Sequence, residues 1–198
     1  MLISTKHYHL SDSSKVYLID SDVFMSIKSR ADAPLLFAGI LNLANSGHVK
    51  TVRQVFKEMK HDPILKTEIL PHRKLMEVKA EDQYCAEVAA KITLISAQAG
   101  HLWPQTGGTT SDPADPWLIA VASHYGYCLV TNENKRSDRK IPAACKITGT
   151  TCECISGPHF FYETGIVTAF DPAHISPCLL YTSPSPRDQR GSRMPSSA

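Results

Sequence analysis

The sequence contains no long apolar run. None of its apolar stretches approaches the roughly 20 residues that a membrane-spanning helix needs. The first fifteen residues, MLISTKHYHLSDSSK, are polar and lack the apolar stretch of a secretory signal. These absences exclude the usual patterns of a membrane or exported protein, so we expect a cytoplasmic protein with no membrane partner.

Closely spaced cysteines are also scarce. Of the six cysteines, only Cys152 and Cys154 are near neighbours in the sequence, and no second pair accompanies them. Zinc sites built on thiolates usually show two spaced pairs or a set of cysteines and histidines. We therefore expect reduced and mostly buried thiols rather than a zinc–thiolate site.

Without the end of the chain, the sequence has no excess of basic over acidic residues. Residues 178–198, CLLYTSPSPRDQRGSRMPSSA, have no helical or strand period and resemble the translated sequencing-adapter tails that end many metagenomic reading frames, so we expect an artefactual tail. The whole chain has 21 lysines and arginines and 19 acids; without the three arginines and one aspartate of the tail, residues 1–177 have 18 of each. Any attraction for nucleic acid must therefore come from a local patch.

Short apolar stretches alternate with helical patterns along the rest of the chain. Residues 16–20 and 127–131 are predicted to be buried strands, and 143–149 is a candidate third strand. Apolar periodicity predicts helices over residues 34–46, 52–60, 115–126 and 157–165, and a mainly helical segment 63–98 with a long run from about Lys74 to Ser96. This alternation predicts an α/β fold, a three-layer α/β/α sandwich with a mostly parallel central sheet.

Acidic residues follow the predicted strands. The stretch VYLIDSDVF stops its apolar run at Asp20 and Asp22, and Asn132 and Glu133 follow the second strand. Ligands of such sheets collect outside the carboxyl ends of the strands. Further acids lie in between: Glu58, Asp112 and Asp115. Converging carboxylates are tolerated only if they take up protons or bind a cation, and a set of oxygen ligands alone selects Mg²⁺ or Mn²⁺.

Each of these acids also has a purely structural interpretation. Asp20 and Asp22 suit a turn or the cap of a helix that begins at Val23. Asp115 precedes Pro116, a common first-turn residue, and suits an N-cap. The remaining acids suit a solvated helix position or a loop: Glu58, Asp112 and Glu133. The order and spacing of the acids along the chain is the stronger signal.

That order resembles a known family. The segments YLIDSDVF, VRQVFKEM and DPADPWLIAVASHYGYCLVTNE together resemble the PIN domain, the nuclease fold of VapC-type toxins. The acids of the family pattern match Asp20, Glu58, Asp115 and Glu133. The segment KIPAACKITGTTCECI is similar to a less characterised bacterial and archaeal branch of PIN-like proteins. The resemblance implies a nuclease domain over residues 15–170, after an N-terminal extension at 1–14.

The resemblance implies a metal-dependent endoribonuclease that cleaves RNA to leave a 5′-phosphate and a 3′-hydroxyl. Asp20, Glu58 and Asp115 would hold Mg²⁺ or Mn²⁺, and Glu133 with Asp22 or Asp112 would assist. The expected substrate-binding residues are Thr131, Asn132, Lys135, Arg136, Arg139 and Lys140. A cognate antitoxin and a homodimer are expected by analogy alone. His124 and His159 are expected to be structural rather than part of the site.

The sequence departs from the family at two positions, and two other interpretations stay open. Glu133 stands where many PIN nucleases have Asp, and Asp22 stands where Ser, Thr or Asn is usual. YLIDSDVF also resembles the motif of haloacid-dehalogenase-type phosphatases, with Asp20 as nucleophile and Asp22 as general acid; that interpretation leaves Glu58 and Asp115 without a role. The third possibility is a catalytically inactive PIN-like module that binds RNA or protein.

Overall fold

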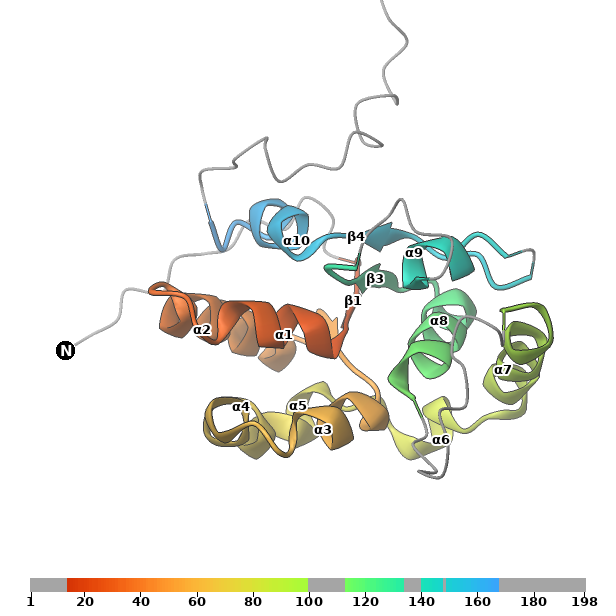
Figure 1. The fold of residues 1–198 in the computed structure, drawn as a ribbon, viewed down its shortest axis with the longest axis horizontal. Helices are drawn as coiled ribbons and strands as arrows, with labels where there is room; N and C mark the ends of the chain where they lie inside the picture. The colour runs from red at the N-terminus through yellow and green to blue at the C-terminus, as the bar shows by residue number, and fades with distance from the viewer. Residues whose placement is uncertain (1–13, 100–112, 134–139, 148, 168–198) are drawn as a thin grey trace, which may run out of the picture.

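The computed structural model describes residues 14–99, 113–133, 140–147 and 149–167 (Figure 1). The predicted tail at 178–198 and Asp112 lie outside these residues, as does nearly all of the predicted extension at 1–14. Within them the fold is α/β, and a four-stranded sheet runs through the middle of the molecule. No helix in this described part of the chain combines the length and apolar character needed to cross a membrane.

The sheet is parallel throughout, in the order β2-β1-β3-β4. The strands are β1 Tyr17–Ile19, β2 Val49–Lys50, β3 Cys128–Val130 and β4 Cys154–Ile155. All three residues of β1 are buried, as expected of a parallel strand that is covered on both faces. The strands predicted at 16–20 and 127–131 are confirmed as β1 and β3.

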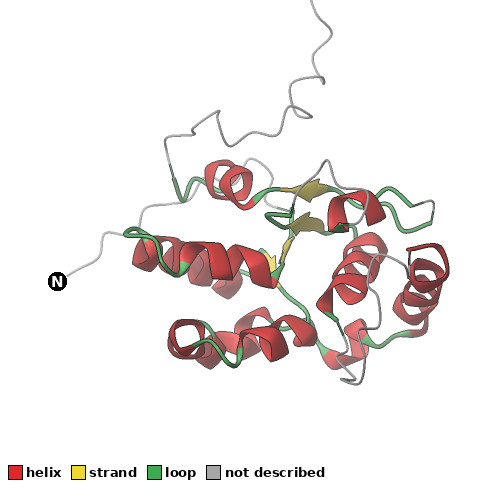
Figure 2. Ribbon diagram, in the orientation of Figure 1, coloured by secondary structure: helices red, strands yellow, loops and turns green. Residues whose placement is uncertain are grey.

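Helices cover both faces of this sheet. They are α1 Ser21–Ile27, α2 Ala33–Asn45, α3 Arg53–Met59, α4 Pro63–Glu68, the 3₁₀ helix η1 Leu70–His72, α5 Arg73–Met76, α6 Ala80–Gln83, α7 Ala86–Ala99, α8 Ala114–Tyr125, α9 Ile141–Ala144 and α10 Gly157–Glu163. Figures 1 and 2 show α1, α2 and α10 on one side of the strands and α7 and α8 on the other. This arrangement confirms the predicted three-layer α/β/α sandwich.

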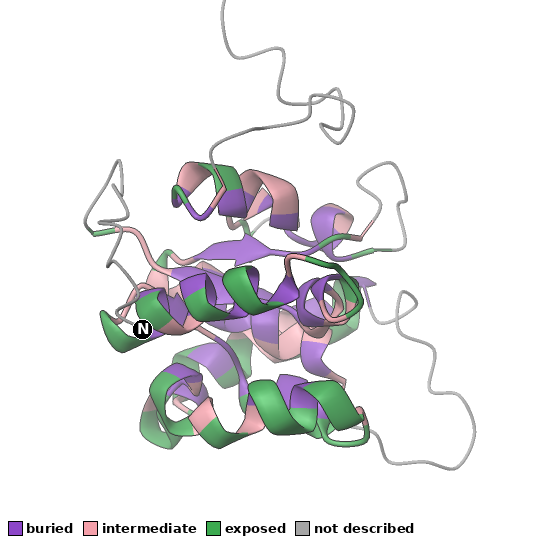
Figure 3. Ribbon diagram, turned by 90° about the vertical axis from the view of Figure 1, so that its left-hand side faces the viewer, coloured by how far each residue is buried: buried purple, intermediate pink, exposed green. Residues whose placement is uncertain are grey.

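The core lies between these layers, and the exposed residues face outward (Figure 3). Helix α8 presents Leu118, Ile119 and Val121 to the core and packs against α7 and β3. It ends at Gly126, whose φ of 69° lies in the left-handed region that favours glycine. The predicted helix over 115–126, with its glycine stop, is therefore confirmed.

The predicted long helix from about Lys74 to Ser96 is wrong. The chain leaves the helical conformation after Met76, where Thr51 N donates a hydrogen bond to the Met76 carbonyl (2.8 Å) and Val78 N donates to the Thr51 carbonyl (2.9 Å). This bridge extends the β2 side of the sheet by one residue pair. The segment then forms α6 and α7 as separate helices. A backbone partner distant in sequence thus overrides a local helical pattern.

The predicted third strand at 143–149 is also wrong. Its first residues belong to α9, which has Pro142 in its first turn, where proline fits a helix well. The fourth strand is instead β4, bound to β3 through Leu129 N to the Glu153 carbonyl (2.8 Å) and Thr131 N to the Ile155 carbonyl (3.0 Å). The second cysteine of the C-x-C stretch, Cys154, therefore begins one edge strand of the sheet.

Candidate metal centre

The carboxyl ends of all four strands meet at one edge of the sheet. Each strand is followed there by a residue with a side-chain oxygen: Asp20, Thr51, Thr131 and Ser156. Thr51 Oγ1 donates to the Ile19 carbonyl at 2.6 Å, and Asp20 N donates to the Val130 carbonyl at 3.0 Å. The sheet therefore places its polar residues together at the edge where parallel α/β proteins bind ligands.

Asp20 is the best-buried acid at this edge, with 4% of its surface exposed. Its Oδ1 accepts a hydrogen bond from Ser21 N at 2.6 Å, and its Oδ2 accepts one from Thr131 Oγ1 at 3.0 Å. Asp20 is therefore the N-cap of α1, which begins at Ser21 rather than at Val23 as expected. Capping engages one oxygen only, so the structural role is compatible with a place in a polar site.

Asp22 lies beside Asp20 and shares a partner with it. Its Oδ2 accepts hydrogen bonds from Thr131 Oγ1 (3.1 Å) and from Asn132 N (2.9 Å). Its Oδ1 is buried and has no hydrogen-bond partner within the described residues. A hydroxyl has one hydrogen, so Thr131 cannot fully satisfy both aspartates. An unsatisfied buried carboxylate oxygen is costly, and a cation would remove that cost.

Both aspartates bind protons more tightly than usual. Burial raises the pKa of Asp20 well above its ordinary value, and the charges of Asp22 and Asp115 raise it further. Burial likewise raises the pKa of Asp22, against the hydrogen bonds from Asn132 and Thr131, and the charge of Glu133 adds to the rise. This is the electrostatic situation in which converging acids take up a proton or a metal ion.

Glu58 connects the site to two helices. Although it is an exposed residue of α3, its Oε2 accepts from Ser21 Oγ (2.6 Å) and its Oε1 accepts from Ala114 N (3.2 Å). The N-cap of α8 is Pro113, which has no capping side chain, so Glu58 provides the cap from another helix. A carboxylate at this position is favoured by the positive end of the helix dipole. Glu58 is therefore not merely a solvated helix residue, because both of its oxygens accept hydrogen bonds from the protein.

Asp115 lies in the first turn of α8, one residue after Ala114, whose N–H donates to Glu58. The N-cap expected at this position is wrong, because Pro113 is the N-cap and Asp115 is the second helical residue. The negative charge of Asp115 raises the pKa of Asp20 and also that of Lys140. Asp20 and Asp115 therefore interact through their charges near the start of α8, and Glu58 is bound there by Ser21 Oγ and Ala114 N. Within the described residues, no three of the acids that match the family pattern bring ligand oxygens within 4.8 Å of one another.

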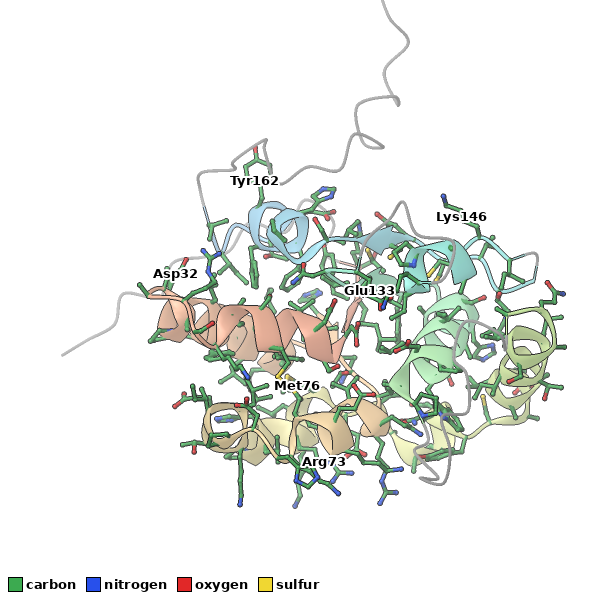
Figure 4. All side chains as sticks on the ribbon, viewed as in Figure 1. Asp32, Arg73, Met76, Glu133, Lys146 and Tyr162 are labelled. Carbon is green, nitrogen blue, oxygen red and sulfur yellow. The ribbon has the colours of Figure 1, made fainter. Side chains whose placement is uncertain are left out.

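Glu133 lies at the same edge but has other partners. Its Oε1 accepts from Lys140 Nζ at 2.8 Å, and its Oε2 accepts from Ile141 N at 2.7 Å. Both oxygens are thus held by the start of α9, although the charge of Glu133 still raises the pKa of Asp22. Figure 4 shows Glu133 near the centre of the view, whereas Lys146 and Tyr162 point outward at its rim.

The expected substrate-binding residues separate into three groups. Thr131 is buried and orients both aspartates. The side chain of Asn132 accepts from Gly157 N (2.9 Å) and donates to Ser26 Oγ (2.8 Å), so it joins β3 to α10 and α1. Of the basic patch, Lys140 binds Glu133, and the others lie outside the described residues: Lys135, Arg136 and Arg139.

Two features of the site were missed from the sequence. Ser21 links the N-cap of α1 to Glu58, but a serine between two aspartates follows no pattern that predicts this. Asn132 is a structural clamp; a Cβ atom added to Gly157 would lie 2.8 Å from its Oδ1, so this glycine is needed for close approach. Both roles depend on neighbours that only the folded chain supplies.

The cysteines occupy two other regions. In the described part of the chain all five are thiols and none forms a disulfide, as expected. Only Cys128 and Cys145 are buried, so the expectation of mostly buried thiols is not met. Hydrogen bonds with Cys152 and Cys154, together with burial, raise the pKa of the Cys145 thiol. Cys85 instead lies beside Glu87 and His124, far from the acids along α8.

A hollow of about 370 Å³ lies at the opposite end of the sheet, where β1 and β3 begin. Its lining residues are Ser14, Lys15, Val16, Tyr125, Gly126, Tyr127 and Glu153. Lys15 is engaged there by Glu163 (2.8 Å) and Glu153 (3.0 Å). This hollow contains none of the acids of the carboxyl edge, and chemistry in parallel sheets concentrates at that other edge.

Residues 17–167 match the pattern of the family described as "Domain of unknown function (DUF4411)". Because this match covers most of the chain, from β1 through α10, the protein belongs to that family. The matched span contains every acid of the carboxyl edge. No match was found among curated proteins.

Proposed function

We propose that this protein is a metal-dependent endoribonuclease that hydrolyses RNA at the carboxyl edge of its sheet, as the resemblance to PIN domains implies. The observation that carries the proposal is the buried pair Asp20 and Asp22. Burial raises the pKa of both, and Asp22 Oδ1 has no partner in the described residues. A divalent cation would neutralise the pair and occupy the unsatisfied oxygen.

The donor set fits Mg²⁺ or Mn²⁺. It consists of carboxylate oxygens, without a thiol or imidazole, and hard cations prefer such ligands. Asp20, Asp22 and Asp115 would hold the ion. Glu58, oriented by the hydrogen bond from Ser21 Oγ, would join them. Glu133 supports the site through its charge and becomes a ligand only when Lys140 releases it.

When bound, the ion supplies stabilisation of charge on the phosphoryl group and lowers the pKa of water. The chain's own residues orient the ligands. Thr131 holds Asp20 and Asp22, and the start of α8 holds Glu58 through Ala114 N. Lys140, whose side chain is 49% exposed, would exchange Glu133 for an RNA phosphate. Lys135, Arg136 and Arg139 are proposed as further phosphate contacts.

Location and partners are proposed from the same resemblance. An RNA substrate fits a cytoplasmic protein. A cognate antitoxin and a homodimer rest on the family analogy alone. The phosphatase alternative has less support, since it gives no role to Glu58 or Asp115, which interact with Ser21 and Asp20. An inactive binding module remains the alternative that activity measurements must separate.

The test compares Asp20→Asn with Asp32→Asn. Asn at position 20 keeps the oxygen that caps α1 but removes the charge. Asp32 has a side chain that is 38% exposed, pairs with Arg30 and lies at the N-cap position of α2 without a side-chain capping bond, so its variant is a matched control. We expect micromolar Mn²⁺ binding by calorimetry in the wild type and the control. We expect no binding in Asp20→Asn and RNA cleavage slower by about 100-fold or more, because several kcal/mol of charge stabilisation are lost.

Two results would contradict the proposal. A folded wild type that binds no Mn²⁺ would remove the metal site. Mn²⁺ binding that Asp20→Asn abolishes, without cleavage of any RNA in a broad screen, would favour the binding module. Circular dichroism of each variant separates loss of the site from loss of the fold.

A further inference from the structure

A second cluster of metal-ligating side chains lies at the other end of α8. Cys85 stands between α6 and α7, Glu87 is in the first turn of α7, and His124 is in the last turn of α8. One ligand atom from each, the thiol sulfur, a carboxylate oxygen and a ring nitrogen, all lie within 4.8 Å of one another. The packing of α7 against α8 brings the three together.

The segment that leads into Cys85 contacts α8 at two places. The ring of Tyr84 packs edge-to-face against Trp117, with centroids 5.0 Å apart. The hydroxyl of Tyr125 donates to the Asp82 carbonyl at 3.0 Å and lies 3.9 Å from the Cys85 sulfur. Contacts on α8 therefore hold the backbone near Cys85 in place, which lowers the cost of organising a binding site.

The cluster is accessible and has a suitable charge. Cys85 and His124 are half-buried, and Glu87 is exposed. Glu87 is an exposed carboxylate in the first turn of α7 and offers an oxygen ligand to an ion from solvent. A thiolate, a carboxylate and a neutral imidazole together carry the charge that balances one divalent cation.

We propose that Cys85, Glu87 and His124 form a binding site for Zn²⁺, with water in the fourth position. In a tetrahedral zinc site with bonds of about 2.0–2.3 Å, ligand atoms are separated by about 3.3–3.8 Å. Ligand atoms already within 4.8 Å need only small side-chain adjustments to reach that geometry. Thiolate and imidazole favour zinc over Mg²⁺ and Mn²⁺. This proposal does not depend on the nuclease function, since the two donor sets share no residue.

The zinc would act as a clamp between α7 and α8. Asp115 and His124 are nine residues apart on one helix, a distance of about 14 Å along its axis. Helix α8 would therefore carry an oxygen-ligated ion at its start and a zinc ion at its end. The cation also lies at the end of the helix that carries the negative dipole charge.

The test uses Co²⁺, whose visible and near-ultraviolet spectrum reports a coordinated thiolate, as a substitute for Zn²⁺. Wild-type protein without a polyhistidine tag should give a saturable thiolate-to-cobalt charge-transfer band that Zn²⁺ displaces. Cys85→Ser should abolish the band. His124→Asn and Glu87→Gln should weaken Co²⁺ affinity by at least about tenfold, because even partners outside the ligand set contribute about 10–100-fold.

Two further variants serve as controls. Cys152→Ser removes another half-buried thiol and should leave the band unchanged. Asp20→Asn should also keep it, so failure of the nuclease proposal would not affect the result. The zinc proposal is overturned by absence of the band in folded wild type, by a band that survives Cys85→Ser, or by loss of the band in Cys152→Ser. If Cys85→Ser does not fold, unchanged Co²⁺ affinity in His124→Asn overturns it.

Discussion

The two ends of α8 collect different ligand atoms. At its start, Asp115 and the capping carboxylate of Glu58 lie with Asp20, and all donors there are oxygens. At its end, His124 lies with Cys85 and Glu87, which offer nitrogen, sulfur and oxygen. The helix dipole favours carboxylates at the first end and a cation at the second. A single helix can therefore position two chemically distinct sites.

The largest expected effect is that a variant at either end of α8 impairs the activity proposed for that end and leaves the other end unaffected. Asp115→Asn should reduce Mn²⁺-dependent RNA cleavage by about 100-fold and leave the Co²⁺ thiolate band unchanged. Glu87→Gln should weaken the Co²⁺ band and leave cleavage unchanged. Both readouts are measured on the same preparations. A weaker Co²⁺ band in Asp115→Asn would mean that the two ends are coupled and that the comparison fails.

The link between Ser21 and Glu58 should have the next largest effect. Ser21→Ala removes the hydroxyl that donates to Glu58 at 2.6 Å, so Mn²⁺ affinity should fall by about tenfold. Ser46→Ala is the control, because the Ser46 hydroxyl donates only to carbonyls of its own helix, Asn42 and Leu43. Calorimetric titration of both variants gives the comparison. Equal affinities would show that Ser21 does not position Glu58 for metal.

Acid should weaken Mn²⁺ binding at the first end. Burial and the charges of Asp22 and Asp115 raise the pKa of Asp20, so below that pKa the metal-free site holds a proton that the ion must displace. Below that pKa, affinity should fall by up to about tenfold for each pH unit when one proton is released. Titrations in buffers of different ionisation enthalpy count the protons. Affinity that does not fall as the solution is made acidic would contradict a raised pKa at the metal site.

Removing the charge of Asp20 should stabilise the metal-free protein. A carboxyl whose pKa is raised by folding contributes stability at acid pH that is lost as pH rises through the folded-state pKa. At neutral pH, Asp20→Asn should therefore raise the melting temperature, by about 2–4 °C for each kcal/mol gained. Asp32→Asn, the control at a side chain that is 38% exposed, should change stability by less than about 0.5 kcal/mol. Saturating Mn²⁺ should stabilise the wild type and not Asp20→Asn.

The smallest expected effect concerns Lys140. Its pair with Glu133 is half exposed on the lysine side, so Lys140→Gln should change the free energy of unfolding by less than about 1 kcal/mol. If Lys140 contacts a phosphate, RNA binding should lose about 0.7 from its slope against the logarithm of salt concentration. Lys146→Gln, at an outward-pointing lysine, is the control (Figure 4). An unchanged slope in Lys140→Gln would remove this residue from the RNA interface.

Local patterns predicted the elements that need no distant partner. The buried strands β1 and β3 follow from uncharged apolar runs, and α8 follows from its periodicity and its glycine stop. The helix predicted from about Lys74 to Ser96 is wrong because Thr51 forms backbone hydrogen bonds with the residues on either side of Glu77. The strand predicted at 143–149 is wrong because β3 pairs with Cys154–Ile155 instead.

The candidate sites show the same division. Asp20, Asp22 and Glu133 were proposed because they follow strands and Asp115 because it begins a helix, whereas Glu58 was proposed only from the resemblance to the family pattern. The role of Ser21 and the clamp of Asn132 were not, because their partners are far away in the sequence. Cys85, Glu87 and His124 were missed for the same reason, since no spaced pair of ligands marks them.

The sequence alone is sufficient for the α/β class, the central strands and the acids that end them, because burial and strand polarity are local properties of the residues. The tertiary structure decides which acids raise one another's pKa, since that depends on burial and on charges from other elements. It also decides that a thiol, a carboxylate and an imidazole meet at the end of α8, because only the packing of α7 against α8 brings them within reach of one ion.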